Sequence, residues 1–435
     1  GRCRTKQMKI IKERERFGSH LGLERIQLVC AALSDPQKRL RFIHIAGTNG
    51  KGSVATFIAQ VLEQAGYKVG LFTSPHLERY NERFRVNGIP IDDQLLEELL
   101  YKTENAIQKV EQDHPEYGPV TEFELGTALA FLYFAEVNVD VVVLETGLGG
   151  RLDATTVVQP ELTIITSIGH DHMDRLGRSL PQIAYEKAGI IKEGVPVVTG
   201  IQHPAAIQVL KEVAEQKGAP MYSLDAVPWK RMHWDMHGGQ LSYPGYEILD
   251  IHLLGAHQLD NAAVALLALD ILQDQGWSIP KEAVRNGMLK ARWPGRMEVV
   301  SFEPLIILDG GHNQEGLMAL AAGLQHISSQ VGSVPFTFVF GMLSNKDIGL
   351  VDVLFPIAER FVFTKADSGR LSPMEPERLV QYGKSRGMRA VGYDSALDAL
   401  QDALETAPVC VCGSLYLVGT VKRYLRTLGV VSKED

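Results

Sequence analysis

This chain has few cysteines, no long apolar run and no excess of positive charge. The 435 residues include 4 Cys, and neither a C-x-x-C pair nor a Cys/His zinc spacing occurs. Cys410 and Cys412 lie two apart in a strand-like run, where they share a face and cannot easily bridge. The sequence therefore argues against a disulfide framework and a structural zinc site, and we expect a reducing, cytoplasmic setting.

We expect neither a membrane nor a nucleic acid as a partner. No apolar run approaches the ~20 residues of a membrane-spanning helix. Lys plus Arg number 44 against 52 Asp plus Glu, a formal net charge of −8, so local positive groups must meet any anionic ligand. Seven basic side chains lie in the first sixteen residues, and we interpret them as a solvated helix face, with a transit peptide or a phosphate-binding arm as alternatives.

Alternating strand and helix patterns indicate an α/β protein. Continuous Val/Ile runs separated by helices predict a mostly parallel sheet that is covered on both faces. Strands are expected at 41–46, 68–72, 140–145, 162–168 and 195–199, and helices at 54–64, 92–112, 121–137, 181–192 and 257–275. Residues 221–252 change character and suggest a short antiparallel excursion.

A second alternating series begins after the turn at 293–296 (Trp-Pro-Gly-Arg). Its strands are expected at 305–309, 335–340, 360–365, 389–393 and 409–412. We therefore predict two α/β domains, 1–296 and 297–435, although the length would allow up to four.

The strongest chemical signal is a glycine-rich turn between the first expected strand and helix. It consists of Gly47, Thr48, Asn49, Gly50, Lys51, Gly52 and Ser53. Glycines let backbone N–H groups converge on phosphate oxygens, the helix N-terminus adds its dipole, and Lys51 adds a charge. Ser53 can offer its hydroxyl to a phosphate-bound magnesium ion. The ordinary P-loop spelling is broken, because Ile45 stands where the first Gly belongs and Gly52 is inserted.

Polar residues also follow the next expected strands. Glu145 ends a strand where parallel sheets present ligands, and it would hold magnesium there, with a strand-end cap as the alternative. His170, Asp171 and His172 suggest either a metal or proton-transfer site or structural histidines. Lys187 lies on a helix among small and apolar residues, where an exposed, ion-paired lysine is the simplest interpretation.

Together these motifs resemble the Mur ligase superfamily and, within it, the folylpolyglutamate synthase/dihydrofolate synthase family. The matching segments are 47–53, 73–77, 81–83, 145–154, 167–172, 186–192, 257–263, 293–296, 309–313, 346–347 and 413–419. The inserted glycine belongs to this family's pattern. The resemblance implies an N-terminal P-loop ATPase domain with a mostly parallel sheet and a smaller, C-terminal Rossmann-like α/β domain.

The resemblance also implies the roles of single residues. The nucleotide would be bound by residues 47–53, Asn261, Arg296 and Asp309. Two Mg²⁺ would be held by Ser74, Glu145 and His172, with Ser53 as a further contributor. Folate and glutamate would be bound by His76, Arg83, Asp153, Ala154, His312 and Ser414. Catalysis would rest on Lys51, Glu145, His172, Lys187 and His312. Lys187 matches a lysine that is carbamylated in the superfamily, which would give an anion able to stabilise the second Mg²⁺.

The implied reaction is ATP-dependent addition of L-glutamate to a folate, to dihydropteroate or to both, through an acyl phosphate. A peptidoglycan-precursor ligase is the nearest alternative, but such ligases generally carry an extra N-terminal domain and only 46 residues precede the phosphate loop. A P-loop kinase or NTPase and a non-catalytic nucleotide-binding module are the others. We expect a monomer, because two domains of one chain can complete each site.

Overall fold

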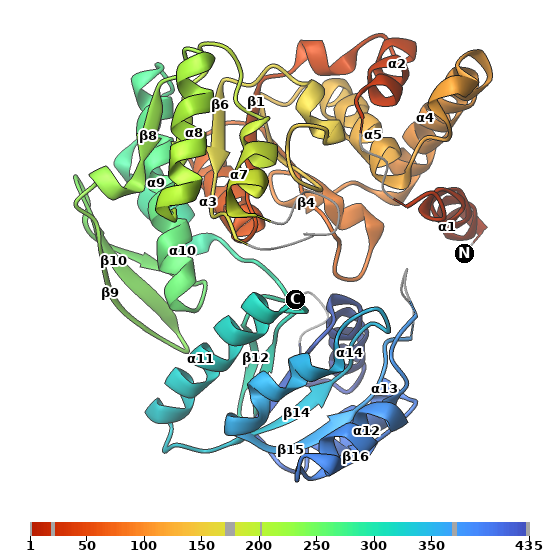
Figure 1. Ribbon diagram of the computed structural model, residues 1–435, viewed down its shortest axis with the longest axis vertical. Coiled ribbons are helices and arrows are strands. Elements are labelled where there is room, and N and C mark those ends of the chain that lie inside the picture. The colour runs from red at the N-terminus through yellow and green to blue at the C-terminus, as the bar shows by residue number, and fades with distance from the viewer. Residues whose placement is uncertain (1, 19–21, 170–178, 201, 368–371, 432–435) are drawn as a thin grey trace. The chain divides into compact units, whose positions relative to one another are not determined.

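The computed structural model describes residues 2–18, 22–169, 179–200, 202–367 and 372–431 (Figure 1). The chain forms two compact units. The first comprises Gly1–Arg231, Leu241–Asp250 and Gln258–Ala291, and the second comprises Met232–Gln240, Ile251–His257 and Arg292–Asp435. A domain boundary between residues 296 and 297 stays a prediction.

A sheet with eight strands in the described part of the chain forms the centre of the first unit. Its order is β4-β3-β2-β5-β1-β6-β7-β8, with the strands β1 Phe42–Ala46, β2 Val69–Phe72, β3 Phe84–Val86, β4 Ile89–Pro90, β5 Val141–Glu145, β6 Leu162–Ile165, β7 Val197–Thr199 and β8 Met221–Ser223. The neighbouring strands β2, β5, β1, β6, β7 and β8 pair in parallel, and β3 and β4 add an antiparallel edge beside β2. The mostly parallel sheet is confirmed; the two short edge strands had no clear sequence signal.

Helices cover both faces of this sheet, and α7 and α8 lie in front of it in Figure 1. The helices of this part of the chain are α1 Arg2–Glu15, α2 Glu24–Ala32, α3 Lys51–Gln64, α4 Asp93–Asp113, α5 Glu122–Glu136, α7 Leu180–Ala188, α8 Pro204–Gln216, α9 Ala256–Asp274 and α10 Lys281–Lys290. On one face, Phe42 and Leu144 pack with α2, α4 and α5, and Ala46 and Ile165 pack with α7 and α8. Helix α3 also packs on this sheet, where it contacts β1, β2 and β5. None of the described helices is long and apolar enough to cross a membrane.

Two elements end three or more residues earlier than the sequence predicts, α7 at Ala188 and β6 at Ile165, and both ends adjoin glycine-rich loops. Helix α7 stops at Ala188 because Gly189 follows, where a Cβ would lie 2.2 Å from Arg151 Cα. Strand β6 stops at Ile165 because the next residues turn toward the phosphate loop. In both places a close approach of backbone overrides the local pattern.

Residues 230–251 form a separate three-stranded sheet of β9 Lys230–Asp235, β10 Gly238–Tyr243 and β11 Glu247–Ile251, in the order β11-β10-β9. The connections are too short for parallel crossovers, so the strands run antiparallel. The predicted antiparallel excursion is confirmed, although β8, at its expected start, joins the large sheet instead.

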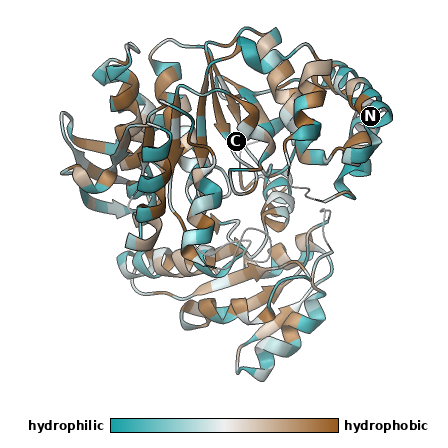
Figure 2. Ribbon diagram, turned by 45° about the horizontal axis from the view of Figure 1, so that its top comes forward, coloured by the Kyte–Doolittle hydropathy of each residue, from teal (hydrophilic) through white to brown (hydrophobic). Residues whose placement is uncertain are grey.

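The second unit is built on a sheet with six strands among the described residues, ordered β12-β13-β17-β14-β15-β16. Its elements are β12 Glu298–Phe302, β13 Leu305–Leu308, α11 Gln314–Gln330, β14 Phe336–Phe340, β15 Ala358–Phe363, α12 Pro376–Ser385, β16 Ala390–Gly392, α13 Ala396–Ala403, β17 Val409–Cys412 and α14 Leu415–Thr427. Only β12 is antiparallel to its neighbour. Figure 2 shows the strands mostly hydrophobic, as expected for a parallel sheet buried by helices. Cys410 and Cys412 are free thiols within β17.

Candidate active site

The phosphate loop joins β1 to α3, and the helix begins at Lys51, earlier than the sequence predicts. Gly50 caps the helix with a φ of 86°, a conformation that favours glycine. A Cβ at Gly50 would lie 2.3 Å from Asn261 Oδ1, and one at Gly47 would lie 1.9 Å from Thr166 Oγ1. The structure therefore brings Asn261, a predicted nucleotide contact, against the loop.

The turn after β6 holds the phosphate loop in place. The amide of Thr48 donates to Ser167 O at 2.7 Å, and the amide of Gly169 donates to Thr48 Oγ1 at 2.9 Å. Thr166 Oγ1 donates to Asn49 O at 2.6 Å. These bonds come from the protein itself and fix the loop backbone, so the loop is preorganised for an anion.

Glu145 lies beside the phosphate loop, because β5 pairs with β1 and Glu145 is the register partner of Ile45. Its side chain is buried, and Oε1 accepts a hydrogen bond from the Ser74 amide at 3.4 Å. Two of the predicted magnesium ligands, Ser74 and Glu145, are thus adjacent. His172, the third, lies outside the described residues, as do His170 and Asp171.

The residues beside the phosphate loop fit magnesium better than a metal ion that is bound by protein side chains alone. Among the described residues no three His, Cys, Asp or Glu side chains gather to hold an ion. Magnesium is typically held by one or two carboxylates together with substrate phosphates and water. Glu145 beside a phosphate loop, with buried Ser53 in the first turn of α3, matches that pattern.

Asp153 holds the loop that follows Glu145. Its Oδ1 accepts from the amides of Gly147 and Leu148 at 3.0 and 2.8 Å, and its Oδ2 accepts from the amide and the hydroxyl of Thr155. Burial raises the pKa of this carboxyl group, while these bonds and the charge of Lys51 oppose the rise. The carboxylate and the buried Ala154 beside it shape the loop; their contact with substrate stays a prediction.

Lys187 is 1% exposed, so the exposed-lysine interpretation is wrong. The sequence held a signal for this, because Lys187 lies four residues after Ile183 on the buried face of α7. A Cβ at Gly150 would lie 2.8 Å from Lys187 O, and the Arg151 amide donates to Glu186 O at 2.7 Å. The loop after Glu145 thus packs on the end of the helix that carries Lys187.

His76 and Arg83, predicted to bind substrate, contact each other directly. Arg83 Nε donates to His76 Nδ1 at 2.9 Å, and Arg83 Nη1 pairs with Glu122 at 3.2 Å. The guanidinium also lies 5.1 Å from the centre of the Tyr80 ring. Burial, together with the Arg83 charge, lowers the pKa of His76 to about 3, so its ring is neutral. Glu122 has no signal in the sequence, because its burial in the first turn of α5 depends on distant segments.

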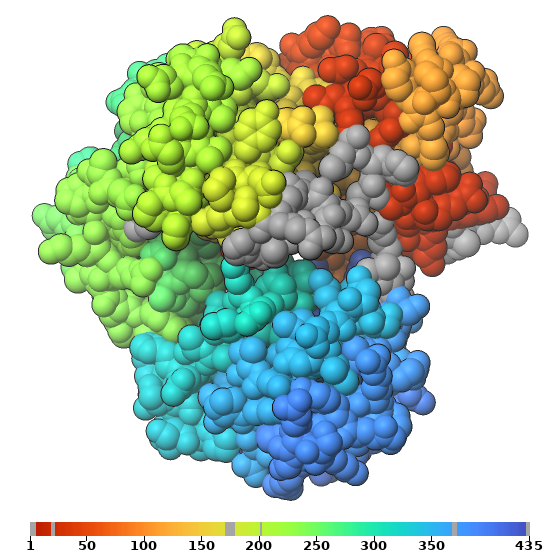
Figure 3. All heavy atoms as spheres, in the orientation of Figure 1, coloured from red at the N-terminus to blue at the C-terminus, as the bar shows by residue number. Residues whose placement is uncertain are grey.

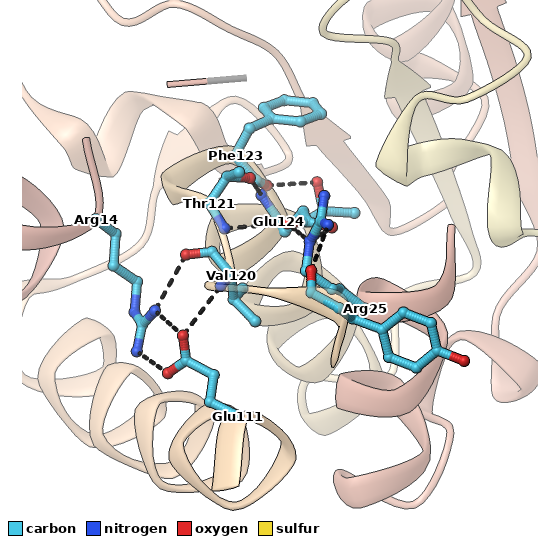
Figure 4. Close-up of polar contacts among 9 residues, drawn as sticks. Arg14, Arg25, Glu111, Val120, Thr121, Phe123 and Glu124 are labelled. Carbon is cyan, nitrogen blue, oxygen red and sulfur yellow. Dashed lines mark hydrogen bonds and ion pairs between the residues drawn. The ribbon is translucent and has the colours of Figure 1, made fainter. Parts of the chain in front are cut away.

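Two N-terminal arginines, Arg14 and Arg25, support the start of α5 (Figure 4). The first turn of this helix also carries Glu122. Arg14 is buried, pairs with Glu104 at 2.6 Å and donates to Val120 O at 3.0 Å. Arg25 pairs with Glu124 at 2.9 Å. Arg14 therefore does not belong to a solvated helix face; its partners lie 90 or more residues away, which local sequence cannot reveal. Figure 3 shows the N-terminal helices in red beside α4 in orange.

In the second unit, Arg296 and Asp309, each predicted to bind the nucleotide, lie close together. A Cβ at Gly310 would lie 2.9 Å from Arg296 Nη1. Asp309 accepts from the amides of Met297 and Gly311 at 2.9 and 2.8 Å. Burial raises the pKa of Asp309, and the charge of Arg296 is the main influence against it.

His312 and Ser414 follow β13 and β17, which are neighbours, so both lie at the same edge of the second sheet. Ser414 caps α14 and is buried. Lys422 and Glu298 form an ion pair at 3.0 Å that the sequence does not predict. Glu298 also accepts from the Gly295 amide at 3.0 Å and thus supports the turn that carries Arg296.

The fold and the phosphate loop define a protein of the Mur ligase type. The family "Mur ligase middle domain" matches residues 45–269, and the family "Dihydrofolate synthetase, C-terminal domain" matches residues 298–426.

Among curated relatives, the dihydrofolate synthase/folylpolyglutamate synthase of Bacillus subtilis is 44% identical over 370 residues, 83% of this chain and 85% of the relative. The crystal structure of the Thermotoga maritima folylpolyglutamate synthase superposes with a TM-score of 0.87 at 34% identity and covers 99% of both chains. A complex of folylpolyglutamate synthase (FPGS) with AMPPCP and folate has a TM-score of 0.80 at 33% identity, over 97% of this chain and 99% of that one. The chain belongs to the folylpolyglutamate synthase/dihydrofolate synthase family, and the predicted family and fold class are confirmed.

Proposed function

We propose that the chain is an ATP-dependent ligase that joins L-glutamate to folates, and that dihydropteroate is a second acceptor. The observation that carries this proposal is the position of Glu145 beside the preorganised phosphate loop at one edge of a parallel sheet. Relatives that cover most of the chain are named for both activities, and one solved relative is a complex with an ATP analogue and folate. These findings support the same choice over a peptidoglycan-precursor ligase or a kinase.

The chemistry requires activation of a poor electrophile. An oxygen of the acceptor carboxylate attacks the γ-phosphorus of ATP, the bond to the β-phosphate oxygen breaks, and ADP leaves. The amine of L-glutamate then attacks the acyl carbon, loses a proton and expels phosphate. Lys51 and the loop amides would offset the charge that builds on the phosphates, and His312 and Ser414 would orient the glutamate.

Ser53, Ser74, Glu145 and His172 would hold two Mg²⁺, which supply positive charge to the transferred phosphoryl group. The buried position of Lys187 supports its carbamylation, because a carbamate would replace a buried cation with an anion suited to a metal site. Mass spectrometry of the native protein, with and without bicarbonate, tests this: unmodified Lys187 in both would contradict it.

A two-acceptor assay tests the function. The protein is given ATP, Mg²⁺ and L-glutamate with either dihydropteroate or a reduced folate, and both ADP and the lengthened product are measured. We expect glutamate-dependent ADP release with each acceptor. No ADP release with either acceptor would overturn the proposed ligase function. Release with only one acceptor would overturn the claim that the chain uses both.

Substitutions test the residue roles. Glu145→Gln and Lys187→Ala should lower kcat about 100-fold or more while the protein stays folded. Glu161→Gln and Lys211→Ala remove the same groups from exposed or half-buried positions and should leave kcat unchanged. Near-normal turnover in either site variant would remove that residue from the site.

We also infer that the chain acts as a monomer in the cytoplasm, since one chain supplies every proposed site residue. Sedimentation at assay concentrations, with and without ATP, tests the first part: a stable dimer would contradict it. Fractionation of cells that express the chain tests the second part.

A further inference from the structure

His44 is a fully buried residue to which neither the sequence analysis nor the proposed mechanism gives a task. It lies in β1, three residues before the phosphate loop, and it is 0% exposed. Its Nε2 lies 2.8 Å from Thr155 Oγ1. Its Nδ1 is buried and has no hydrogen-bond partner among the described residues. The ring therefore has one polar contact, and that contact leads into the loop after Glu145.

The hydrogen-bond inventory fixes the direction of this contact. A threonine hydroxyl has one proton, and that of Thr155 is donated to Asp153 Oδ2. Thr155 Oγ1 must therefore accept from His44, which makes His44 the neutral tautomer with its proton on Nε2. The opposite tautomer would leave a buried N–H without an acceptor, which costs more than an unused lone pair in apolar surroundings.

The chain of bonds continues into the backbone of the loop. Asp153 receives the Thr155 hydroxyl proton on Oδ2 and holds the amides of Gly147 and Leu148 on Oδ1. These two amides begin the turn directly after Glu145. One side chain of the strand that leads into the phosphate loop is thus linked to the loop that follows the neighbouring strand.

We propose that His44 is a positioning residue that, through Thr155 and Asp153, sets the loop after Glu145 relative to the phosphate loop. Its catalytic consequence rests on the proposed function, whereas its structural consequence does not. The residue would act on the magnesium and phosphate geometry without touching substrate. A Gln at this position can present its amide nitrogen where Nε2 lies, whereas an Asn mimics Nδ1 and cannot reach Thr155.

Hydrogen exchange of the apo protein is the primary test. Amides of residues 145–153 are followed in wild type and in the variants His44→Gln, His44→Asn, Thr155→Ser and Thr155→Val. We expect exchange about tenfold faster in His44→Asn and Thr155→Val, and near wild type in His44→Gln and Thr155→Ser. Thr163→Val is the matched control. Thr163 is the register partner of His44, and its buried hydroxyl bonds to Pro196 O, away from the loop after Glu145.

Kinetics provide the second test. In His44→Asn and Thr155→Val, the half-saturating Mg²⁺ concentration should rise about tenfold, while the KM for L-glutamate stays within about twofold. Equal exchange of the loop in His44→Gln and His44→Asn, or wild-type exchange in Thr155→Val, would overturn the proposal. Faster exchange across the whole first unit would overturn it as well, since it would mark a general structural role. If the wild-type protein releases no glutamate-dependent ADP, the proposed function fails, but the exchange test still decides whether His44 is a positioning residue.

Discussion

His44 and His76 are both held neutral, but one ring donates its hydrogen bond and the other accepts one. The pKa of each is lowered to about 3, in both cases first by burial and then by a nearby cation, Lys192 for His44 and Arg83 for His76. His44 donates from Nε2 to the buried hydroxyl of Thr155, which lies in the segment after β5. His76 accepts on Nδ1 from Arg83 and remains partly exposed in a loop.

The difference teaches that a lowered pKa does not by itself mark a binding residue. For His44 the surrounding bonds run through Thr155 and Asp153 to backbone amides of the loop after Glu145, so its neutrality serves the shape of the protein. For His76 the neutral ring accepts from Arg83, whose charge is directed to Glu122. Four sets of variants sharpen this contrast.

Arg83→Met should have the largest effect, because it leaves Glu122 as a buried charge without its cation. The two side chains are 11% and 9% exposed, so we expect a loss of about 3 kcal/mol in the free energy of unfolding, measured with urea. Arg79→Met is the control, since it breaks the Arg79–Asp93 pair, which is 45% and 46% exposed and worth less than about 1 kcal/mol. Equal losses in the two variants would remove the claim that this pair is effectively buried.

His44→Gln should change how stability depends on pH. The pKa of His44 is lowered from 6.5 to about 3, so between these values the unfolded chain binds a proton that the folded one does not. The stabilisation is complete above pH 6.5 and is lost as the pH falls toward 3. Between pH 7 and 5, wild type should therefore lose about 2 kcal/mol more than the variant, measured by urea unfolding. Parallel pH curves would contradict this account of His44.

Lys192→Met should have a smaller effect. The lysine donates to Thr156 O at 2.8 Å, and its loss should cost about 1 kcal/mol of unfolding free energy. The pKa of His44 should rise but stay below 6.5, since burial is the larger cause. NMR titration of the imidazole checks this. An ordinary His44 pKa in the variant would instead make Lys192 the main cause.

Substitutions at His76 should have the smallest effect and the reverse preference from His44. Asn can place an acceptor where Nδ1 lies and so keep the Arg83 bond, whereas Gln reaches past it. We expect His76→Asn to stay within about 0.5 kcal/mol of wild type and His76→Gln to be less stable, by thermal unfolding. The same preference at both histidines would erase the contrast between them.

The parallel sheets, the phosphate loop and the family could all be predicted, because each rests on local patterns or on motifs in a fixed order. Lys187 was misjudged on its chemistry although its spacing on α7 held the answer. Arg14, Glu122 and His44 could not be found this way. Their burial and their partners come from segments far along the chain, and a single sequence records no such contacts.

The strand order has a consequence for synthesis on the ribosome. Strand β1 precedes the other described strands of its sheet in the sequence, yet it lies between β5 and β6. The phosphate loop is held by residues 118 and 121 positions later. A nascent chain that has emerged only as far as α5 has the whole glycine-rich motif but lacks the flanks that shape it. We therefore expect nucleotide affinity to arise late and abruptly during translation, after β6 has left the exit tunnel, a step that nascent chains arrested at increasing lengths can reveal.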